Sequence, residues 1–269
     1  MTAKSNVISF RFNGDLKNLE VIISINELVT RYLRIPILEL NVATIDKQNN
    51  NWKLKSKTLK YTNKNLQKLM GIYQNAEGKN IEISFELLTP SNNYEFKSRD
   101  IDISVNYNHK GKINSLNFIV NSQIQIGNNW WDFIEEILRF LRFNKCDVLY
   151  GYVFQLDNFK MPAFYVEGIK SEYLSSEEAG KVSKWLKEKK NCDKKMWDIF
   201  WINIWHLNSD NFFLVDGIEE IVGCDNVKII DNVIIFKIAG DLNDFDVMVY
   251  DGVRKKLHKY LSSFNLLMQ

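Results

Sequence analysis

Alternating apolar and polar positions recur along the first half of the chain and predict a series of β-strands. One pair of strands is expected to meet across a turn at Asn13-Gly14, and another across a turn at His109-Lys110-Gly111. Apolar residues at i, i+3, i+4 and i+7 predict a helix over residues 63–74. The expected strands cover residues 7–12, 19–25, 35–45, 81–88, 101–107 and 116–120.

The spacing of the apolar positions changes from two to 3.6 near residue 128, where a helix is predicted. Acidic residues lie near its start and basic residues near its end, as the helix dipole favours. Residues 197–207 are so uniformly apolar that their periodicity does not distinguish a strand from a helix. The other elements expected are strands at 148–156 and 163–168, a helix opening at Ser175, a hairpin of residues 227–230 and 233–238, and a final helix from Val249 to Leu261.

These elements predict an α+β fold in which mainly antiparallel sheet packs against amphipathic helices. The change of pattern suggests a strand-rich N-terminal subdomain, residues 1–128, and a mixed C-terminal subdomain, residues 129–269. A single domain is the alternative, because no flexible linker marks the boundary.

The composition indicates a folded protein of the cytoplasm. Apolar residues make up 45% of the 269 positions and aromatic residues 13%, which is ample for a core. The first residues lack the apolar run of a secretory signal, and no stretch approaches the roughly 18 apolar residues of a membrane span. The three cysteines form no disulfide pattern, and the net charge of +2 argues against a nucleic-acid partner.

The charges are distributed unevenly along the chain. Residues 1–128 contain 17 basic and 11 acidic side chains, whereas residues 193–253 contain 4 basic and 12 acidic side chains. An uneven solvated surface would account for this difference. The alternative is an acidic face that receives a basic partner. Its candidate contact residues are Asp210, Asp216, Glu219, Glu220 and Asp225.

Six of the seven tryptophans follow residue 128. Adjacent helical residues point about 100° apart, so Trp130 and Trp131 cannot both face the core. Residues 197, 201 and 205 recur every four positions and would form one aromatic ridge on a helix. Core packing explains most such rings, but aromatic anchors beside acids are also typical of protein-binding hot spots. The candidate anchors are Trp131, Trp201 and Trp205.

Motifs of common enzyme classes are missing, including dinucleotide-binding, phosphate-loop, serine-hydrolase and zinc-protease signatures. We therefore expect a non-enzymatic protein without cofactor or metal. The acids of residues 241–246 lack the glycine and final glutamate of an EF-hand loop, which favours helix capping. His206 is the one candidate for chemistry, paired with Cys192, Cys224 or an acid.

Four segments carry a resemblance to a known family. They are residues 151–154 (GYVF), 161–169 (MPAFYVEGI), 197–207 (WDIFWINIWHL) and 238–242 (IAGDL). In this order the chain resembles bacterial immunity proteins of polymorphic toxin systems, nearest to the immunity protein 52 type, over residues 129–262. The resemblance implies a cytosolic, non-enzymatic protein that binds a cognate toxin and blocks it. With the acidic residues named above, the expected partner is a basic C-terminal toxin domain whose active site is occluded.

Two other functions remain open at this stage. One is an enzyme whose site assembles around His206, and the other is a non-catalytic subunit of a larger assembly. A carboxylate or thiol within about 3 Å of His206 would favour the enzyme. A flat, acidic and aromatic surface would favour protein binding. The oligomeric state is open in every case.

Overall fold

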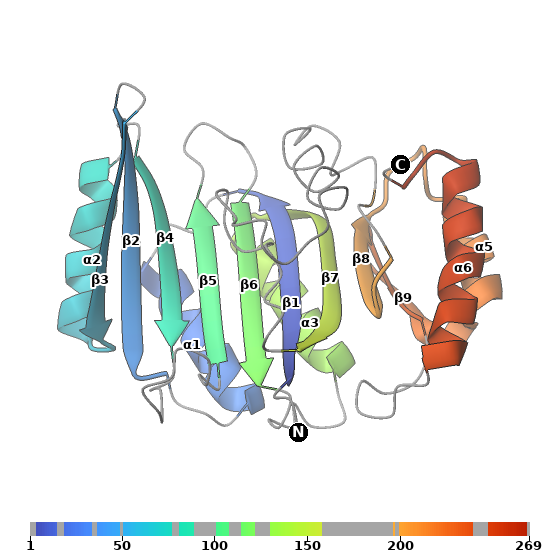
Figure 1. Cartoon of the computed structure of the whole chain (residues 1–269), viewed down its shortest axis with the longest axis horizontal. Coiled ribbons are helices and arrows are strands. Elements are labelled where there is room, and N and C mark those ends of the chain that lie inside the picture. Colours follow the sequence, from blue (N-terminus) through green and yellow to red (C-terminus); the bar gives the residue numbers. More distant parts are fainter. Residues whose placement is uncertain are drawn as a thin grey trace. The chain divides into compact units, whose positions relative to one another are not determined.

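The computed structural model describes most of the chain and shows an α+β protein of antiparallel strands and helices (Figure 1). Two compact units make up the chain. We call residues Arg11–Asp147 the N-terminal unit, and Met1–Phe10 together with Val148–Gln269 the C-terminal unit. The residues described are 4–14, 19–33, 37–48, 51–76, 81–88, 101–107, 114–121, 130–157, 196, 199–238 and 247–267.

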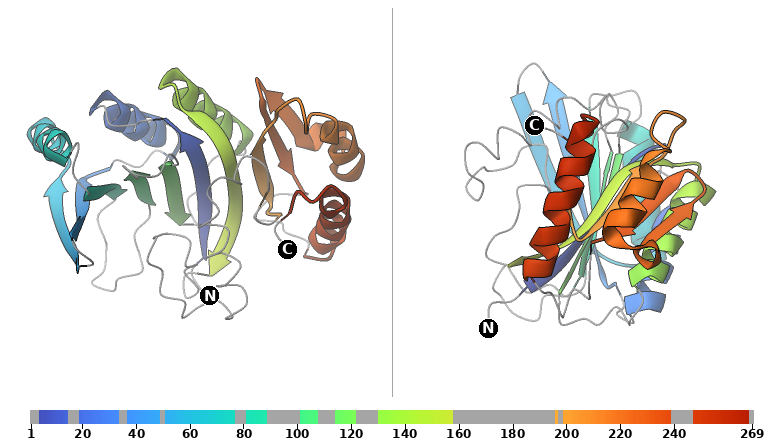
Figure 2. Two further views of the ribbon diagram at one scale, coloured as in Figure 1. Left: turned by 90° about the horizontal axis from the view of Figure 1, so that it is seen from above. Right: turned by 90° about the vertical axis from the view of Figure 1, so that its right-hand side faces the viewer.

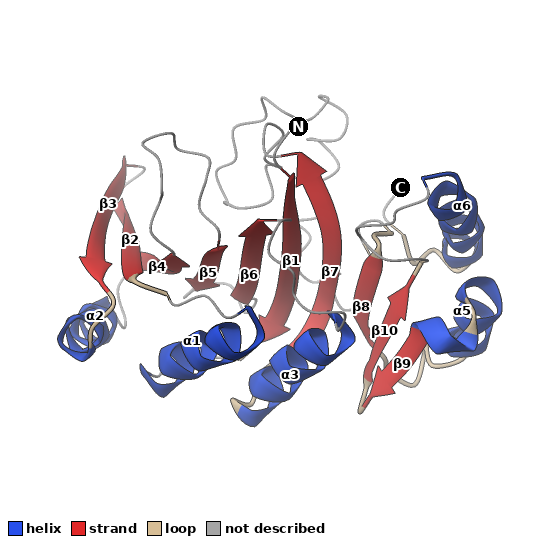
Figure 3. Cartoon of the chain, turned by 90° about the horizontal axis from the view of Figure 1, so that it is seen from below, coloured by secondary structure: helices blue, strands red, loops and turns tan. Residues whose placement is uncertain are grey.

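An antiparallel sheet with strand order β3-β2-β4-β5-β6 forms the centre of the N-terminal unit. The helices α1, α2 and α3 lie on one face of this sheet (Figure 3). The strand pairing predicted for residues 101–107 and 116–120 is confirmed, since Ile101 pairs with Val120 and Val105 with Leu116. The bounds are α1 Leu19–Leu33, β2 Glu39–Gln48, β3 Asn51–Lys60, α2 Asn63–Ala76, β4 Ile81–Leu88, β5 Ile101–Tyr107, β6 Asn114–Asn121 and α3 Trp130–Phe143.

Two elements of this unit differ from the prediction. Residues 19–25 were expected as a strand but begin the helix α1. Ile25, Leu28 and Val29 are buried at helical spacing, so packing overrides the strand preference of the β-branched run. The strand β3 was not predicted, because its lysines leave few apolar positions. Lysine is common on edge strands, and β3 is the last strand of the order.

The helix α3 joins the N-terminal unit through its predicted apolar stripe. Phe133 is fully buried, and its ring centroid lies 5.4 Å from that of Tyr32 and 5.7 Å from that of Phe118. The N-terminal unit accordingly extends to Asp147 and includes α3. The buried residues of the stripe are Phe133, Ile134, Ile137, Leu138 and Leu141.

The C-terminal unit contains the strand order β1-β7-β8-β10-β9, with β8, β10 and β9 joined by antiparallel pairs. The predicted hairpin is confirmed across Asp231, whose φ of 57° lies in the left-handed region. Gly151 allows a close approach of β1, because a Cβ there would lie 2.9 Å from the Ser9 carbonyl oxygen. The bounds are β1 Lys4–Asn13, β7 Asp147–Asp157, β8 Ile202–His206, α5 Leu214–Val222, η4 Cys224–Asn226, β9 Val227–Ile230, β10 Val233–Lys237 and α6 Val247–Ser263.

Residues 202–206 form a strand, which resolves the ambiguity of the apolar run. Asn203 on β8 is fully buried, and its side chain accepts a hydrogen bond from the Phe200 N–H and donates one to the Phe200 carbonyl, both 2.8 Å long. The expected strand at 163–168 and the helix opening at Ser175 lie outside the described residues. None of the described helices is both long enough and apolar enough to cross a membrane.

Candidate functional site

The five predicted acidic residues lie along one segment of the C-terminal unit. Asp210 is in the turn before α5, Asp216, Glu219 and Glu220 are on α5, and Asp225 is in η4. Glu219 is half-buried and the other four are exposed. Residues 210–225 contain no basic side chain. The segment therefore has five negative charges in 16 residues, which supports the expectation of a local acidic surface.

The helix α5 divides its residues cleanly between core and solvent. Leu214, Val215, Ile218 and Val222 are buried on one face. Phe213, Asp216, Gly217 and Glu220 follow the i, i+3, i+4, i+7 spacing of the opposite face. The apolar stripe thus fixes which way the two carboxylates and the phenylalanine point.

The turn before α5 is held by two asparagines. The Asn208 Oδ1 accepts hydrogen bonds from the N–H groups of Asp210 at 2.9 Å and Asn211 at 3.1 Å. The Asn211 Oδ1 accepts one from the Asn208 N–H at 2.7 Å, and its Nδ2 donates to the His206 carbonyl at 3.1 Å. Side chains that satisfy turn backbone in this way fix the turn's conformation. The hydrogen bonds of Asn208 and Asn211 therefore fix the position at which α5 begins.

The helix α6 lies beside α5 (Figures 1 and 2). The ring centroids of Phe213 and Phe264 are 5.1 Å apart, and those of Tyr260 and Phe264 are 5.3 Å apart. Gly217 lies directly against Tyr260, because a Cβ at Gly217 would overlap the hydroxyl and ring of that tyrosine. Phe213 thus meets Phe264 while Gly217 meets Tyr260, so the two helices run antiparallel.

Backbone contacts hold α6 in place within the same unit. The Arg254 Nε donates a hydrogen bond of 3.1 Å to the Ile199 carbonyl, and the Tyr250 hydroxyl donates one of 3.4 Å to the same oxygen. Beyond the helix, the Met196 N–H donates to the Leu266 carbonyl at 2.8 Å. Both ends of α6 are therefore tied to the segment that precedes β8.

We call Phe213, Asp216, Glu220, Tyr260 and Phe264 the α5–α6 surface. Phe213 remains 55% exposed and Phe264 42% exposed, although their rings touch. Burial raises the pKa of Tyr260, and the negative charges of Asp216 and Glu220 raise it further. The phenol is consequently protonated at neutral pH and lies within the electric field of both carboxylates.

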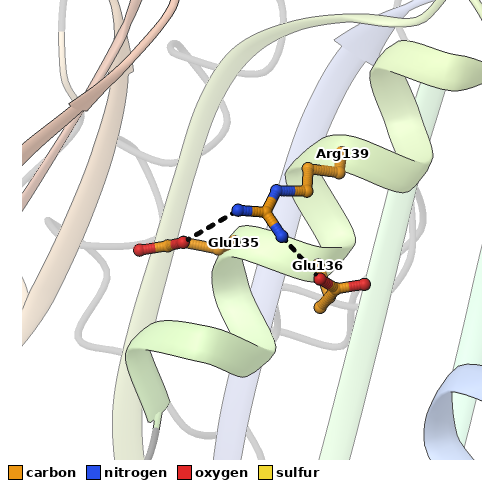
Figure 4. Close-up of polar contacts among 3 residues, drawn as sticks. All are labelled: Glu135, Glu136 and Arg139. Carbon is orange, nitrogen blue, oxygen red and sulfur yellow. Dashed lines mark hydrogen bonds and ion pairs between the residues drawn. The ribbon is translucent and has the colours of Figure 1, made fainter.

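The carboxylates of α5 lack a cationic partner within the described part of the chain. There, Asp216, Glu219, Glu220 and Asp225 make no ion pair. The acids of α3 are different, because Arg139 contacts Glu136 at 2.8 Å and Glu135 at 3.5 Å (Figure 4). Within the described residues, Glu135 and Glu136 on α3 are paired with a cation and the acids of α5 are not.

The tryptophan predictions need correction. Trp201 is 3% exposed and Trp205 is fully buried, so neither ring is a surface anchor. Their segment is a bend and a strand, so the aromatic ridge expected of a helix is not formed, and both rings lie in the core. Trp131 is half-buried on α3, in the other unit, and Trp197 lies outside the described residues.

Among the described residues, His206 has no arrangement typical of catalysis. Its Nδ1 lies 3.4 Å from the Asn232 amide nitrogen, and within the described residues no carboxylate or thiol forms a hydrogen bond with the ring. Cys224 is exposed, whereas Cys192 and residues 241–246 lie outside the described residues. The described residues also contain no group of three His, Cys, Asp or Glu side chains placed to hold a metal.

Sequence reasoning missed the aromatic part of the α5–α6 surface. The helix α5 was not predicted, although Leu214, Val215, Ile218 and Val222 have helical spacing. With that helix recognised, Phe213 would have fallen outside the apolar stripe and stood out as an exposed ring. Phe213 contacts Phe264, about fifty positions further along the chain, and no local sequence pattern predicts that contact.

No family model, curated protein or solved structure matches the chain.

Proposed function

We propose that this chain is an immunity-type protein that acts in the cytoplasm, binds a cognate bacterial toxin through the α5–α6 surface and occludes the toxin's active site. The observation that supports this proposal is the placement of exposed aromatic rings beside carboxylates that have no cation in the described chain. Aromatic anchors of this kind dominate the energetics of many protein interfaces.

The acids favour a basic toxin domain as the partner. Five negative charges between residues 210 and 225 create a local field that attracts positive charge. Such steering accelerates association by about 10- to 1,000-fold and falls as ionic strength rises. The proposal therefore predicts an association rate that decreases strongly with added salt.

The α5–α6 surface is suited to tight binding because its supports are already ordered. Four buried apolar residues hold α5, a side-chain hydrogen bond from Arg254 to the Ile199 carbonyl holds α6, and a backbone hydrogen bond holds the residues that follow it. A preorganised surface loses little conformational entropy when it binds. An inhibitor that must block a toxin before damage occurs benefits from this property.

The decisive experiment identifies a neighbouring gene that encodes a large secreted polymorphic protein and co-expresses the chain with the C-terminal domain of that protein. We expect the chain to protect growth and to purify as a complex with that domain. The double variant Phe213→Ala/Phe264→Ala should lose protection, whereas Phe143→Ala should keep it. Phe143 is the matched control because it is 88% exposed but lies on α3. Full protection by the double variant would contradict the proposed surface.

Association kinetics test the electrostatic part separately. Glu219→Lys/Glu220→Lys should slow complex formation at low salt and flatten its dependence on salt. Asp251→Lys is the control, since Asp251 is exposed on the face of α6 opposite Tyr260. The control changes the net charge by two units and the double variant by four, so a slowing by the control of half the logarithmic size would show that only overall charge matters.

A further inference from the structure

We propose that the α5–α6 surface holds one arginine side chain of the bound protein, with its guanidinium against the Tyr260 and Phe264 rings and between the Asp216 and Glu220 carboxylates. This inference rests on the proposed function, because it assumes that the surface binds a basic protein. It names the side chain that the surface selects.

The aromatic part of the site is a continuous row of three rings. Phe213 meets Phe264 with an interplanar angle of 67°, and Phe264 meets Tyr260 with one of 75°. The exposure of Phe213 and Phe264 leaves ring surface for a ligand. A cation over such a ring is attracted by the negative π-face, and arginine is the most frequent cation in these contacts.

The acidic part adjoins the same rings. Asp216 and Glu220 are one helical turn apart, and Gly217 between them adds no side chain to that face. The ring of Tyr260 lies against Gly217, so its hydroxyl end is placed next to both acids. Both carboxylates raise the pKa of this tyrosine, in agreement with that placement.

This combination selects a guanidinium over other groups. A guanidinium is planar and weakly hydrated, so it can stack on a ring while its N–H groups donate to carboxylates. The lysine ammonium is more strongly hydrated and does not stack. An apolar side chain would desolvate the acids without pairing them, and an acidic one would be repelled.

The described cations nearest in sequence leave the two carboxylates of the site unpaired. Lys256 and Lys259 are exposed on α6, and in the described residues neither forms an ion pair with Asp216 or Glu220. A partner cation could therefore pair with these carboxylates without displacing a described cation of the chain.

Binding of small peptides to the full chain tests this inference. The probes are the acetylated, amidated tripeptides Gly-Arg-Gly, Gly-Lys-Gly and Gly-citrulline-Gly, titrated while aromatic NMR signals are recorded. Citrulline has the shape of arginine without its charge. We expect the arginine peptide to shift the Tyr260 and Phe264 signals. The lysine peptide should bind more weakly, because its ammonium is more strongly hydrated and forms no bidentate pair, and the citrulline peptide should not bind.

Two isosteric variants sharpen the result. Asp216→Asn/Glu220→Gln should abolish binding of the arginine peptide, whereas Asp251→Asn, on the opposite face of α6 from Tyr260, should retain it, and neither should unfold below the wild-type temperature. Equal binding of arginine and lysine peptides, or binding unaffected by the double variant, would overturn the arginine site. In that event the co-expression experiment still decides the proposed function, because protection from a toxin does not require binding of a free peptide.

Discussion

The helices α3 and α5 are built alike toward the core and differently toward solvent. Each buries an apolar stripe, which on α3 includes Phe133 and on α5 includes Ile218. On α3 the acids at positions 135 and 136 are paired with Arg139. On α5 the described chain offers no cation to the acids, and aromatic rings of α6 lie beside them. Among the described residues, the acids at positions 135 and 136 on the solvent face of α3 are paired with a cation. Those on the solvent face of α5 are not, and they lie beside aromatic rings.

The difference carries a small cost in stability. Asp216 and Glu220 are like charges at i, i+4 spacing, which destabilises a helix by about 0.2–0.5 kcal/mol. Exposed ion pairs such as those of Arg139 contribute about 0–1 kcal/mol. Neither value is large, so stability alone does not explain why α5 keeps unpaired charge. The cation that we propose the partner supplies would account for it.

The largest effect is expected where α5 and α6 touch. Gly217→Ala should lower the free energy of unfolding by about 1–3 kcal/mol, because the new methyl group would overlap Tyr260. Gly252→Ala is the control, since a Cβ there meets no atom within 4 Å, and it should raise stability by up to about 1 kcal/mol. Urea unfolding measures both.

The double variant Gly217→Ala/Tyr260→Ala tests the cause of this loss. If overlap with Tyr260 is responsible, the glycine substitution should no longer destabilise once that ring is removed. A loss of the same size in both backgrounds would place the cause elsewhere.

A smaller effect is expected from exchanging the charge patterns of the two helices. Arg139→Ala should destabilise by about 0.2–1 kcal/mol, since it removes exposed ion pairs. Glu220→Arg creates an i, i+4 pair with Asp216 and should stabilise by about 0.3–0.5 kcal/mol. Thermal unfolding detects both changes. The same Glu220→Arg protein should lose toxin binding, and retained binding would show that the unpaired charge is not needed.

The smallest effect is expected at alkaline pH. The raised pKa of Tyr260 means that the folded protein holds this proton more tightly than the unfolded chain does. Its contribution to stability is fully present below the unfolded value of 10.0 and is lost as pH rises through the raised pKa. Tyr260→Phe should therefore lose less stability than wild type between neutral pH and pH above 10, as measured by urea unfolding. Tyr32 and Tyr61, whose pKa values burial also raises, titrate in both proteins and cancel in the comparison.

The sequence was most informative where one period ran over many residues. The helix α3 and the hairpin of β5 and β6 were predicted because each repeats a single pattern. Residues 19–25 were misassigned because their β-branched side chains favour a strand, and only Leu28 and Val29 further along reveal the helical period. Local propensity decides little when packing against a sheet supplies more free energy.

The candidate site was predicted in its charges but not in its rings. A run of acids without basic residues is visible in the sequence, and exposed positions such as Asp216 and Glu220 follow from it. Which aromatic residues reach the surface depends on which face each element buries. Trp201 and Trp205 were chosen for their size, and large rings are the residues that a core most readily takes up.

The division of α5 into two faces also bears on how this protein could change over evolutionary time. Leu214, Val215, Ile218 and Val222 hold the helix, whereas Phe213, Asp216 and Glu220 face outward. Because the two sets share no residue, outward positions can be replaced to suit a new partner while the inward positions keep the unit folded. Gly217 is the exception, since it faces outward but is constrained by Tyr260. A library that varies positions 213, 216 and 220 and fixes 217 is therefore the natural starting point for giving this scaffold a new specificity.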